Sequence, residues 1–247
     1  MQLYELENTK YFCVAFYALI PAAGTGTRFR GSIPKQYLAL AGKPMLWHAV
    51  ASMCVAPVQS VFVVLAPEDR EFARHDWSAF AGKLEPLYCG GETRRDSVYN
   101  GMVAAMAAVD ADDWVLVHDA ARPCLPKRDL DSLVAETRED QIGGILALPA
   151  ADTVKKAAKD EAGAMRVAGT EDRSQLWLAQ TPQMFRCGLL VQALKDAKTA
   201  VTDESGAVEQ MGLKPRLVAG SRENIKVTFP EDMKIAEAIL ENHRRRS

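Results

Sequence analysis

The chain has 247 residues, of which 48% are apolar and 25% are charged, a balance typical of a soluble globular protein. A chain of this length buries enough surface to fold without disulfide or metal cross-links, and one α/β domain can hold all of it. The formal net charge is −2 and the sequence pI is about 6.1. This excludes an overall positive field that would draw the chain to nucleic acid or to an anionic membrane. Any phosphate-binding surface must therefore be local.

The cysteines and the N-terminal region indicate the compartment. The five cysteines are scattered and form no C-x-x-C pair, which favours reduced thiols in a reducing compartment. An apolar run at 11–20 follows Glu5 and Glu7 instead of the positive segment of a signal peptide. It is also shorter than the ~20 residues that span a bilayer. We therefore expect a cytoplasmic protein in which this run is a buried strand.

Short apolar runs alternate with helical patterns along most of the chain. Runs at 13–20, 60–65, 114–117 and 144–148 are typical of strands covered on both faces, as in a mainly parallel sheet. Between them, apolar residues repeat at helical spacing at Val98, Met102, Met106 and Val109. Residues 228–231 resemble a capping box that would open a last helix through Ile239. This alternation predicts an α/β fold with a doubly wound, mainly parallel, Rossmann-like sheet.

Residues 149–177 break the alternation with small and polar side chains around Gly163. The pattern leaves two interpretations open: a surface loop, or a protruding β-arm that meets another subunit. We see no internal repeat and no clear linker elsewhere, so we expect residues 1–247 to form a single domain. The basic residues 244–246 are typical of a solvated helix end.

The first predicted strand leads into P-A-A-G-T-G-T-R at 21–28, followed by P-K-Q at 34–36. Small residues let backbone N–H groups approach an oxygen-rich ligand, and a loop that follows a strand lies at the ligand-binding edge of an open α/β sheet. The segment also carries four cations, Arg28, Arg30, Lys35 and Lys43. These features favour a polyanion such as a triphosphate. A glycine-rich turn with ordinary surface cations is the alternative.

Two other nucleotide-binding patterns are not met in this loop. The dinucleotide fingerprint requires glycine or alanine where this chain has Phe29, and it requires an acid about twenty residues later. No Asp or Glu lies between Gly24 and Glu68. The phosphate-loop pattern of nucleoside triphosphatases fails too, because Pro44 follows its glycine and lysine. A dehydrogenase is therefore the least favoured class.

A second cluster follows the predicted strand at 114–117. Asp119 lies at the expected ligand edge, where its carboxylate could hold Mg²⁺ that bridges phosphates. Arg122 could bind a second phosphate. His118 would point to the face opposite Asp119 if the strand continues, so we interpret it as structural.

Six motifs in this order resemble those of one enzyme family. They are P-A-A-G-x-G-x-R with P-K-Q, G-G-x-x-R-x-x-S-V at 90–98, V-H-D-A-A-R-P at 117–123, Q-T-P-Q at 180–183, T-D-E at 202–204 and N-I-K-V-T at 224–228. Over about residues 13–240 the chain is similar to the 2-C-methyl-D-erythritol 4-phosphate cytidylyltransferases of the non-mevalonate isoprenoid pathway. The resemblance implies Mg²⁺-dependent transfer of CMP from CTP to methylerythritol phosphate, with release of pyrophosphate.

The resemblance also implies roles for individual residues. The catalytic cations would be Arg28, Lys35 and Lys226. The nucleotide would be bound by Ala22, Ala23, Gly24, Gly91, Glu92 and Ser97. The acceptor and the reacting centre would be surrounded by Asp119, Arg122, Thr153, Arg173, Thr181 and Thr202, with Asp119 also facing Mg²⁺. Residues 149–177 would be the exchanged arm of a homodimer, from which Arg173 would enter the partner's active site.

The implied chemistry agrees with the residues present. A phosphate nucleophile is already ionised, so positioning and electrostatic stabilisation suffice and no catalytic His or Cys is needed. Two alternatives remain open: a ribitol-phosphate cytidylyltransferase of the same fold, and a non-catalytic nucleotide-sensing or partner-binding protein. Cations on both sides of the expected α-phosphate favour an enzyme over the second alternative.

Overall fold

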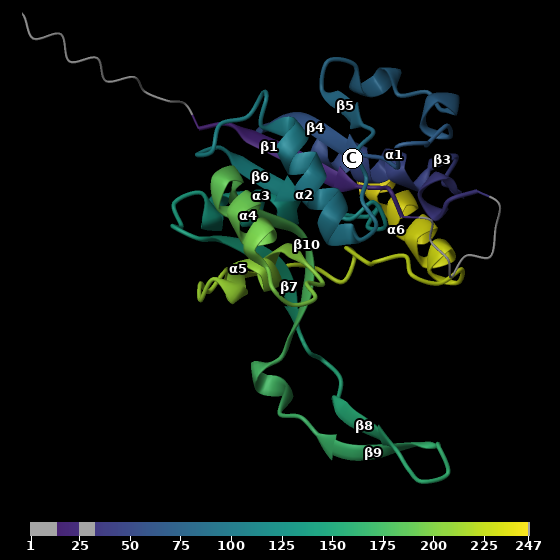
Figure 1. The fold of residues 1–247 in the computed structure, drawn as a ribbon. Coiled ribbons are helices and arrows are strands. Elements are labelled where there is room, and N and C mark those ends of the chain that lie inside the picture. The colour runs from purple at the N-terminus through teal and green to yellow at the C-terminus, as the bar shows by residue number, and fades with distance from the viewer. Residues whose placement is uncertain (1–13, 25–32, 247) are drawn as a thin grey trace, which may run out of the picture.

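The computed structural model describes residues 14–24 and 33–246, and its centre is a seven-stranded sheet in the order β11-β7-β10-β6-β1-β4-β5 (Figure 1). The strands are β1 (Phe16–Pro21), β4 (Val58–Val64), β5 (Leu84–Leu87), β6 (Trp114–Val117), β7 (Gly143–Pro149), β10 (Trp177–Arg186) and β11 (Arg216–Ala219). Within this sheet only β10 runs antiparallel to its neighbours. The mainly parallel sheet predicted from the sequence is confirmed.

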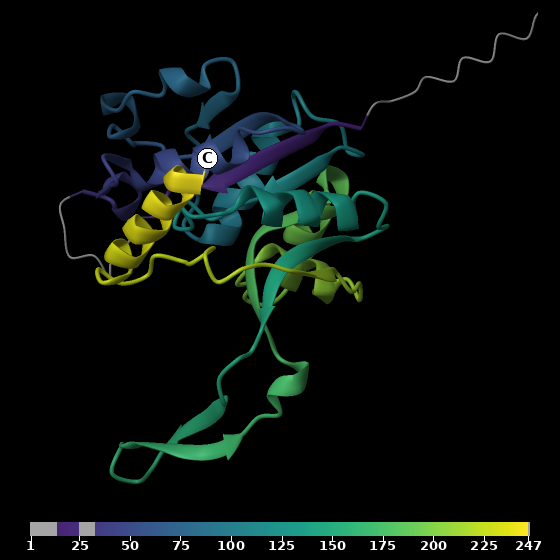
Figure 2. The same ribbon diagram turned by 180° about the vertical axis from the view of Figure 1, so that it is seen from behind.

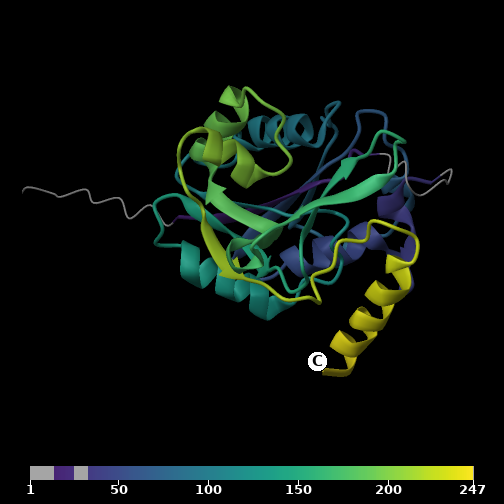
Figure 3. The same ribbon diagram turned by 90° about the horizontal axis from the view of Figure 1, so that it is seen from below.

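Helices cover both faces of the sheet, as Figure 3 shows from below. The helices α1 (Met45–Met53) and α3 (Lys127–Thr137) pack on one face, and α2 (Arg94–Ala105), α4 (Cys187–Asp196) and α5 (Glu204–Gln210) pack on the other. Successive residues of a strand point to opposite faces. In β6, accordingly, Trp114 and Leu116 join the core under α1 and α3, whereas Val115 and Val117 join the core under α2 and α4. This is the doubly wound arrangement that the alternation predicts.

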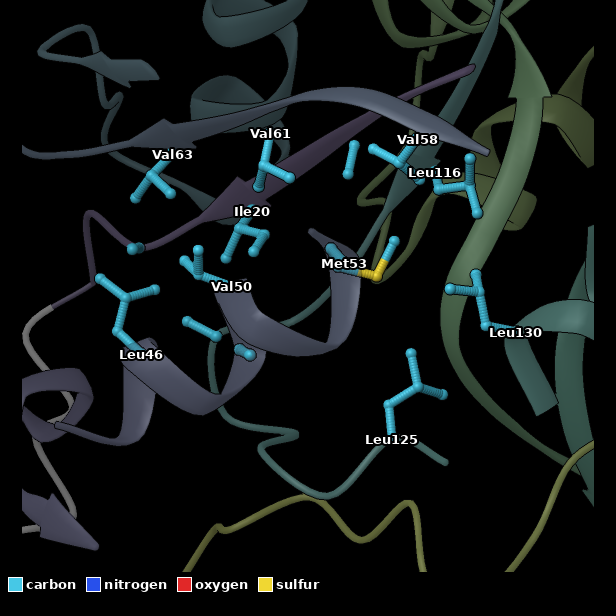
Figure 4. Close-up of a cluster of buried hydrophobic side chains, with 14 of the residues drawn as sticks. Ile20, Leu46, Val50, Met53, Val58, Val61, Val63, Leu116, Leu125 and Leu130 are labelled. Carbon is cyan, nitrogen blue, oxygen red and sulfur yellow. The ribbon is translucent and has the colours of Figure 1, made fainter. Parts of the chain in front are cut away.

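The core on the α1 side shows why the apolar runs become strands. Ile20 of β1 and Val61 of β4 lie against Leu46 and Val50 of α1 (Figure 4). All four side chains are fully buried. Each buried side chain of this size contributes roughly 1.5–3 kcal/mol relative to an exposed one. The strands are therefore held in the centre of the molecule, and the loops at their ends are left to form a site.

Helix α2 begins with a capping box. The Thr93 hydroxyl accepts the backbone N–H of Asp96, and the Asp96 carboxylate accepts the backbone N–H of Thr93. Val98 and Met102 are buried as their spacing predicts, whereas Met106 lies just after the helix as its C-cap and is 39% exposed. The cap fixes the start of α2 beside the loops that follow β1 and β6.

The last helix differs from its predicted bounds. Helix α6 (Asp232–Arg246) begins four residues after the predicted start and extends past Ile239. The carboxylate of Asp232 accepts the backbone N–H groups of Thr228 and Phe229 at 2.7 and 2.8 Å. Asp232, not Glu231, therefore satisfies the free N–H groups before the helix, and residues 228–231 form the turn that leads into it.

Residues 149–177 contain a separate antiparallel hairpin, β8 (Lys155–Lys159) and β9 (Met165–Thr170). The hairpin stands away from the body of the molecule in Figures 1 and 2. Its two strands form a sheet of their own and do not extend the central sheet. A role for this segment in dimerisation stays a prediction.

Three short 3₁₀ helices, η1 (Lys35–Tyr37), η2 (Phe72–Arg74) and η3 (Ser78–Phe80), and the small hairpin of β2 (Ala39–Leu40) and β3 (Lys43–Pro44) lie near α1 and β5. A fourth, η4 (Arg173–Gln175), follows β9. None of the helices among residues 14–24 and 33–246 combines the length and the apolar character that crossing a lipid bilayer requires.

Candidate active site

A pocket of about 420 Å³ opens beyond the carboxyl ends of β1 and β6. Its wall comes from the segments that follow these two strands, from the first turn of α2, from η1 and from the loop before α6. The wall includes nine of the residues predicted for the site: Ala22, Ala23, Gly24, Lys35, Gly91, Glu92, Ser97, Asp119 and Lys226. Arg28, the third predicted catalytic cation, lies outside the described residues. Parallel strands bring these sequence-distant loops to one edge, as expected for an open α/β sheet.

The glycine pair before α2 gives this wall its shape. A Cβ atom added to Gly90 would lie 2.3 Å from the Cβ of Ala23 and 2.8 Å from the carbonyl oxygen of Leu65, which no side chain tolerates. The loop of Ala23 and the start of α2 can therefore touch only because residue 90 is glycine. Ser97 is 3% exposed, and its hydroxyl accepts the N–H of Gly91 at 3.1 Å. Ser97 thus fixes the backbone of the pocket from beneath.

A smaller pocket of about 220 Å³ adjoins the first and shares three of its residues, Arg94, Asp119 and Lys226. Its wall also includes Arg122, Thr181 and Thr202, which the sequence assigns to the acceptor. The two pockets therefore meet at one charged cluster. This geometry provides space for two ligands whose adjoining ends would lie against the same cations.

Asp119 is the centre of that cluster. Its Oδ1 lies 2.9 Å from a terminal nitrogen of Arg94, and its Oδ2 lies 2.7 Å from the ammonium of Lys226. Burial opposes ionisation, yet the Arg94 guanidinium and then the Lys226 ammonium hold the pKa of the Asp119 carboxyl well below its usual range. The carboxylate is therefore charged at every physiological pH and holds both cations at the junction of the pockets.

Arg94 and Glu204 are the functional residues that sequence reasoning missed. The Glu204 side chain is 1% exposed and accepts from both terminal nitrogens of Arg94. Contact with Glu204 and Asp119 raises the pKa of Arg94 further above its ordinary range, against the effect of burial. Both residues stand inside recognised motifs, G-G-x-x-R and T-D-E, so the motifs themselves were the available signal.

The two predicted catalytic lysines approach the pocket from different parts of the chain. The ammonium of Lys35 donates to the backbone carbonyl of Val227 at 2.7 Å. Val227 is fully buried, and its N–H donates to the carbonyl of Ala121 at 2.8 Å. The residue next to Lys226 therefore anchors both Lys35 and the loop after β6, and this brings the two lysines to one side of the pocket.

Arg122 is more enclosed than its predicted substrate role implies. It is 8% exposed and donates to the backbone carbonyl of Asn224 at 2.7 Å. The side chain of Asn224 in turn donates to the carbonyl of Thr181 at 2.8 Å. Burial lowers the pKa of Arg122, while nearby Asp119 opposes this shift. Arg122 thus lines the smaller pocket and also ties the loop of Lys226 to β10.

Thr153 and Arg173 lie apart from this cluster. Neither lines the two pockets among the described residues, and both are exposed on the segment 149–177. A terminal nitrogen of Arg173 donates to the backbone carbonyl of Ala151, which places Arg173 at the base of the hairpin. Their assignment to the site of a partner subunit stays a prediction.

The described residues do not fit a preformed Mg²⁺ site. Within residues 14–24 and 33–246 there is no group of three or more His, Cys, Asp and Glu that could hold a metal ion. Asp119, the predicted ligand, already contacts a cation through each carboxylate oxygen. Mg²⁺ prefers several oxygen ligands in an octahedral arrangement. In this arrangement those oxygens would have to come from a bound phosphate ligand.

Fold and site together define the class: an α/β protein whose cation-lined pocket at the carboxyl edge of the sheet suits a nucleotide phosphate. The family model described as 2-C-methyl-D-erythritol 4-phosphate cytidylyltransferase matches residues 16–242. A protein of that name from Nitrosospira multiformis is 54% identical over 231 residues, which cover 92% of this chain and 98% of the relative. The chain belongs to the 2-C-methyl-D-erythritol 4-phosphate cytidylyltransferase family.

Solved structures agree with this assignment. A crystal structure of 4-diphosphocytidyl-2C-methyl-D-erythritol synthase matches with a TM-score of 0.78 and 39% identity, and the match covers 92% of this chain and 98% of that one. The 2-C-methyl-D-erythritol 4-phosphate cytidylyltransferase of Francisella tularensis matches with a TM-score of 0.74 and 35% identity, over 91% and 99% of the two chains. The resemblance read from six motifs is confirmed.

Proposed function

We propose that the chain transfers CMP from CTP to 2-C-methyl-D-erythritol 4-phosphate and releases pyrophosphate. The observation that carries this proposal is the junction of the two pockets at Asp119, Lys226 and Arg94. The larger pocket has the volume and the backbone-lined wall for CTP. The smaller pocket would hold the acceptor, with its phosphate directed at the same cations. Family membership supplies the identity of both substrates.

In the proposed reaction an oxygen of the acceptor phosphate attacks the α-phosphorus of CTP. A new P–O bond forms, and the bond to the bridging oxygen breaks, so that the electron pair leaves with pyrophosphate. Because the acceptor phosphate is already ionised, no general base is required. The barrier comes from bringing two polyanions together and from charge on the five-coordinate phosphorus, so fixed cations should supply most of the catalysis.

Lys35 and Lys226 are the proposed cations at the α-phosphate, together with Arg28 from outside the described residues. Asp119 would keep Lys226 oriented until the nucleotide arrives, because their contact is only 2.7 Å. The Lys226 side chain is 47% exposed, so its ammonium can move from the carboxylate to a phosphate without unfolding the loop. We propose that CTP binds as its magnesium complex, because the phosphate oxygens supply the ligands that the pocket lacks.

We also propose that residues 149–177 act as the arm of a homodimer. The hairpin and its base expose large apolar side chains, with Met165 63%, Val167 67% and Leu178 59% exposed. An apolar surface on a projecting segment is typical of an interaction site. A partner in contact with it would cover these side chains and bring Arg173 toward the partner's smaller pocket. The free thiols at Cys54, Cys89, Cys124 and Cys187 support a cytoplasmic location.

The test is pyrophosphate release in the presence of Mg²⁺. CTP would be compared with ATP, GTP and UTP, and methylerythritol 4-phosphate with ribitol 5-phosphate. We expect release only with CTP and methylerythritol 4-phosphate. Turnover with ribitol 5-phosphate would keep the reaction and change the acceptor. If folded protein released no pyrophosphate with any pair, the nucleotide-sensing alternative would replace this proposal.

A further inference from the structure

His118 is buried directly beneath the charged cluster, and the proposed reaction does not use it. It follows β6, is 0% exposed and precedes Asp119 in the chain. Its Nε2 lies 3.0 Å from the backbone carbonyl oxygen of Arg122, and its Nδ1 lies 3.1 Å from the hydroxyl of Thr181. One imidazole therefore connects the loop of Asp119 and Arg122 to β10.

The direction of each hydrogen bond follows from the partners. A carbonyl oxygen can only accept, so Nε2 must carry a proton and donate it to Arg122. The ring is fully buried, and its two nitrogens contact the Arg122 carbonyl and the Thr181 hydroxyl, neither of which is an anion. Burial therefore favours the neutral ring, in which Nδ1 has a free lone pair. The Thr181 hydroxyl must then donate to Nδ1.

The Thr181 hydroxyl has a second hydrogen-bond partner besides His118. The backbone N–H of Asp119 donates to the Thr181 oxygen at 2.9 Å. The pairing of β10 with β7 is irregular between Ala179 and Gln183, which leaves Thr181 outside the regular ladder there. Thr181 thus accepts from Asp119 and donates to His118, and its one proton is used.

We propose that His118 is a positioning residue that acts through Thr181 to fix the backbone of Asp119. A hydroxyl whose proton is held by Nδ1 has none to donate to the acceptor phosphate. Thr181 therefore serves the reaction by holding the loop of Asp119. Although Thr181 lines the smaller pocket, its hydroxyl does not donate a hydrogen bond to the acceptor phosphate. This inference rests on the proposed function for the identity of the reaction that the loop serves. The hydrogen bonds of His118 and Thr181 do not depend on it.

The position of the Asp119 carboxylate in the site therefore depends on the hydrogen bonds of His118 and Thr181. Nε2 of His118 fixes the carbonyl of Arg122, and Thr181 fixes the N–H of Asp119, so both ends of the loop 119–122 are held from below. The Asp119 carboxylate in turn holds Lys226 and Arg94. Loss of either bond would leave buried polar groups without partners and would let the carboxylate move.

The first test needs no substrate. Protein labelled with ¹⁵N-histidine would be studied by NMR in its ligand-free state, with His118 assigned by comparison with His118→Asn or, should that variant not fold, by substitution of His48, His75 and His243. We expect a protonated Nε2 and an unprotonated, hydrogen-bonded Nδ1 from pH 6 to pH 8. A proton on Nδ1 would overturn the proposal, because the Thr181 proton would then be free for a substrate.

The second test is a double-mutant cycle of Thr181→Val and His118→Asn. If His118 acts through Thr181, each single variant lowers kcat about 10–100-fold, as loss of an outer partner of a site residue commonly does. The double variant is then little worse than the poorer single one, since neighbours on one path are not additive. Thr181→Ser keeps the hydroxyl and should recover most of the loss. The proposal would be overturned if Thr181→Val raised only the KM for the acceptor and if the kcat losses of the two single variants multiplied in the double variant.

Two matched control variants distinguish the proposed role of His118 and Thr181 from the general effect of losing a buried polar side chain. Thr137 is also a fully buried threonine, and its hydroxyl donates to the carbonyl of Leu133 at 2.5 Å. His48 is a buried histidine whose Nε2 contacts the carbonyl of Leu40 at 2.7 Å. Thr137→Val and His48→Asn should lower stability without the kcat loss. An equal loss of kcat in these controls would count against a specific role of His118. Failure of the proposed function would be distinguishable from failure of this inference: the wild type would be inactive, while His118 would still carry its proton on Nε2.

Discussion

Arg94 donates from both terminal nitrogens to the two carboxylate oxygens of Glu204, at 2.6 and 3.0 Å, across 110 positions of the chain. Its Nε donates at 3.0 Å to Asp119. One guanidinium therefore joins the first turn of α2, the loop after β6 and the first turn of α5. Arg94 and Asp119 both line the two pockets, so the ion pairs of this guanidinium set the relative position of the residues at the junction.

The first prediction concerns this ion pair. Glu204→Ala should lower the free energy of unfolding by about 3 kcal/mol, because it leaves part of a largely buried guanidinium charge without its partner. Urea unfolding followed by circular dichroism measures the change. The matched control is Glu136→Ala, which removes an exposed pair with Arg216 at 3.0 Å and should cost less than about 1 kcal/mol. Equal losses in the two variants would show that the Arg94–Glu204 pair is no stronger than a surface one.

The second prediction concerns the two lysines. Lys35→Ala and Lys226→Ala should fold normally and lose on the order of 10²–10³ in kcat, as the loss of one preorganised donor does. Steady-state pyrophosphate release measures this. Lys83→Ala is the control, because its ammonium also donates to a backbone carbonyl, that of Val58 at 3.2 Å, but away from the pocket. Near-wild-type turnover in either test variant would remove that lysine from the mechanism.

The third prediction concerns Arg173. Arg173→Glu should abolish use of the acceptor while CTP binding, measured by calorimetry, stays intact. Arg166→Glu, on the hairpin itself, where Arg166 pairs with Asp160 at the surface, should affect neither. A loss of CTP affinity equal to the loss of acceptor use would refute this division of roles.

The exchange of the arm gives a further consequence of the same substitution. Inactive Arg173→Glu and inactive Lys35→Ala chains, when mixed, should regain activity. One site of the mixed dimer would then combine an intact body with an intact arm from the partner. No recovery in dimers shown to be mixed would place Arg173 in the site of its own chain.

The fourth prediction is a pH dependence of stability from His118. Burial lowers its pKa from 6.5 to about 4, so between these values the unfolded chain binds a proton that the folded chain does not. Stability therefore falls as pH falls through this window, by about 1.4 kcal/mol per pH unit within it. The contribution lost between pH 7 and pH 5 is about 2 kcal/mol. His118→Asn has no imidazole to titrate, so its stability does not change in this way. The difference in free energy of unfolding between wild type and His118→Asn, measured in urea, should therefore be smaller at pH 5 than at pH 7 by that amount. A deficit that is constant with pH would show that His118 titrates normally.

Much of the fold was accessible from the sequence, because the signals involved are local. The run 114–117 is a strand with the bounds it was predicted to have, since four consecutive apolar residues can be buried on both faces only in the middle of a sheet. The start of α2 follows from Thr93 and Asp96, three residues apart. The prediction failed at α6, where Asp232 rather than Glu231 provides the cap, because two adjacent acids offer the same signal and only the turn geometry separates them.

The sequence by itself determined the family and nine residues of the larger pocket, because these nine residues lie in short motifs that can be read without knowledge of the fold. Only the tertiary structure decided what these residues contact. Lys35 meets the carbonyl of Val227 across 192 positions, and His118 meets Thr181 across 63. Pairings of this kind depend on the order of the strands, which no local pattern encodes. The path of the chain through the sheet therefore decides which charges become partners, and with them the roles of Arg94, Glu204 and His118.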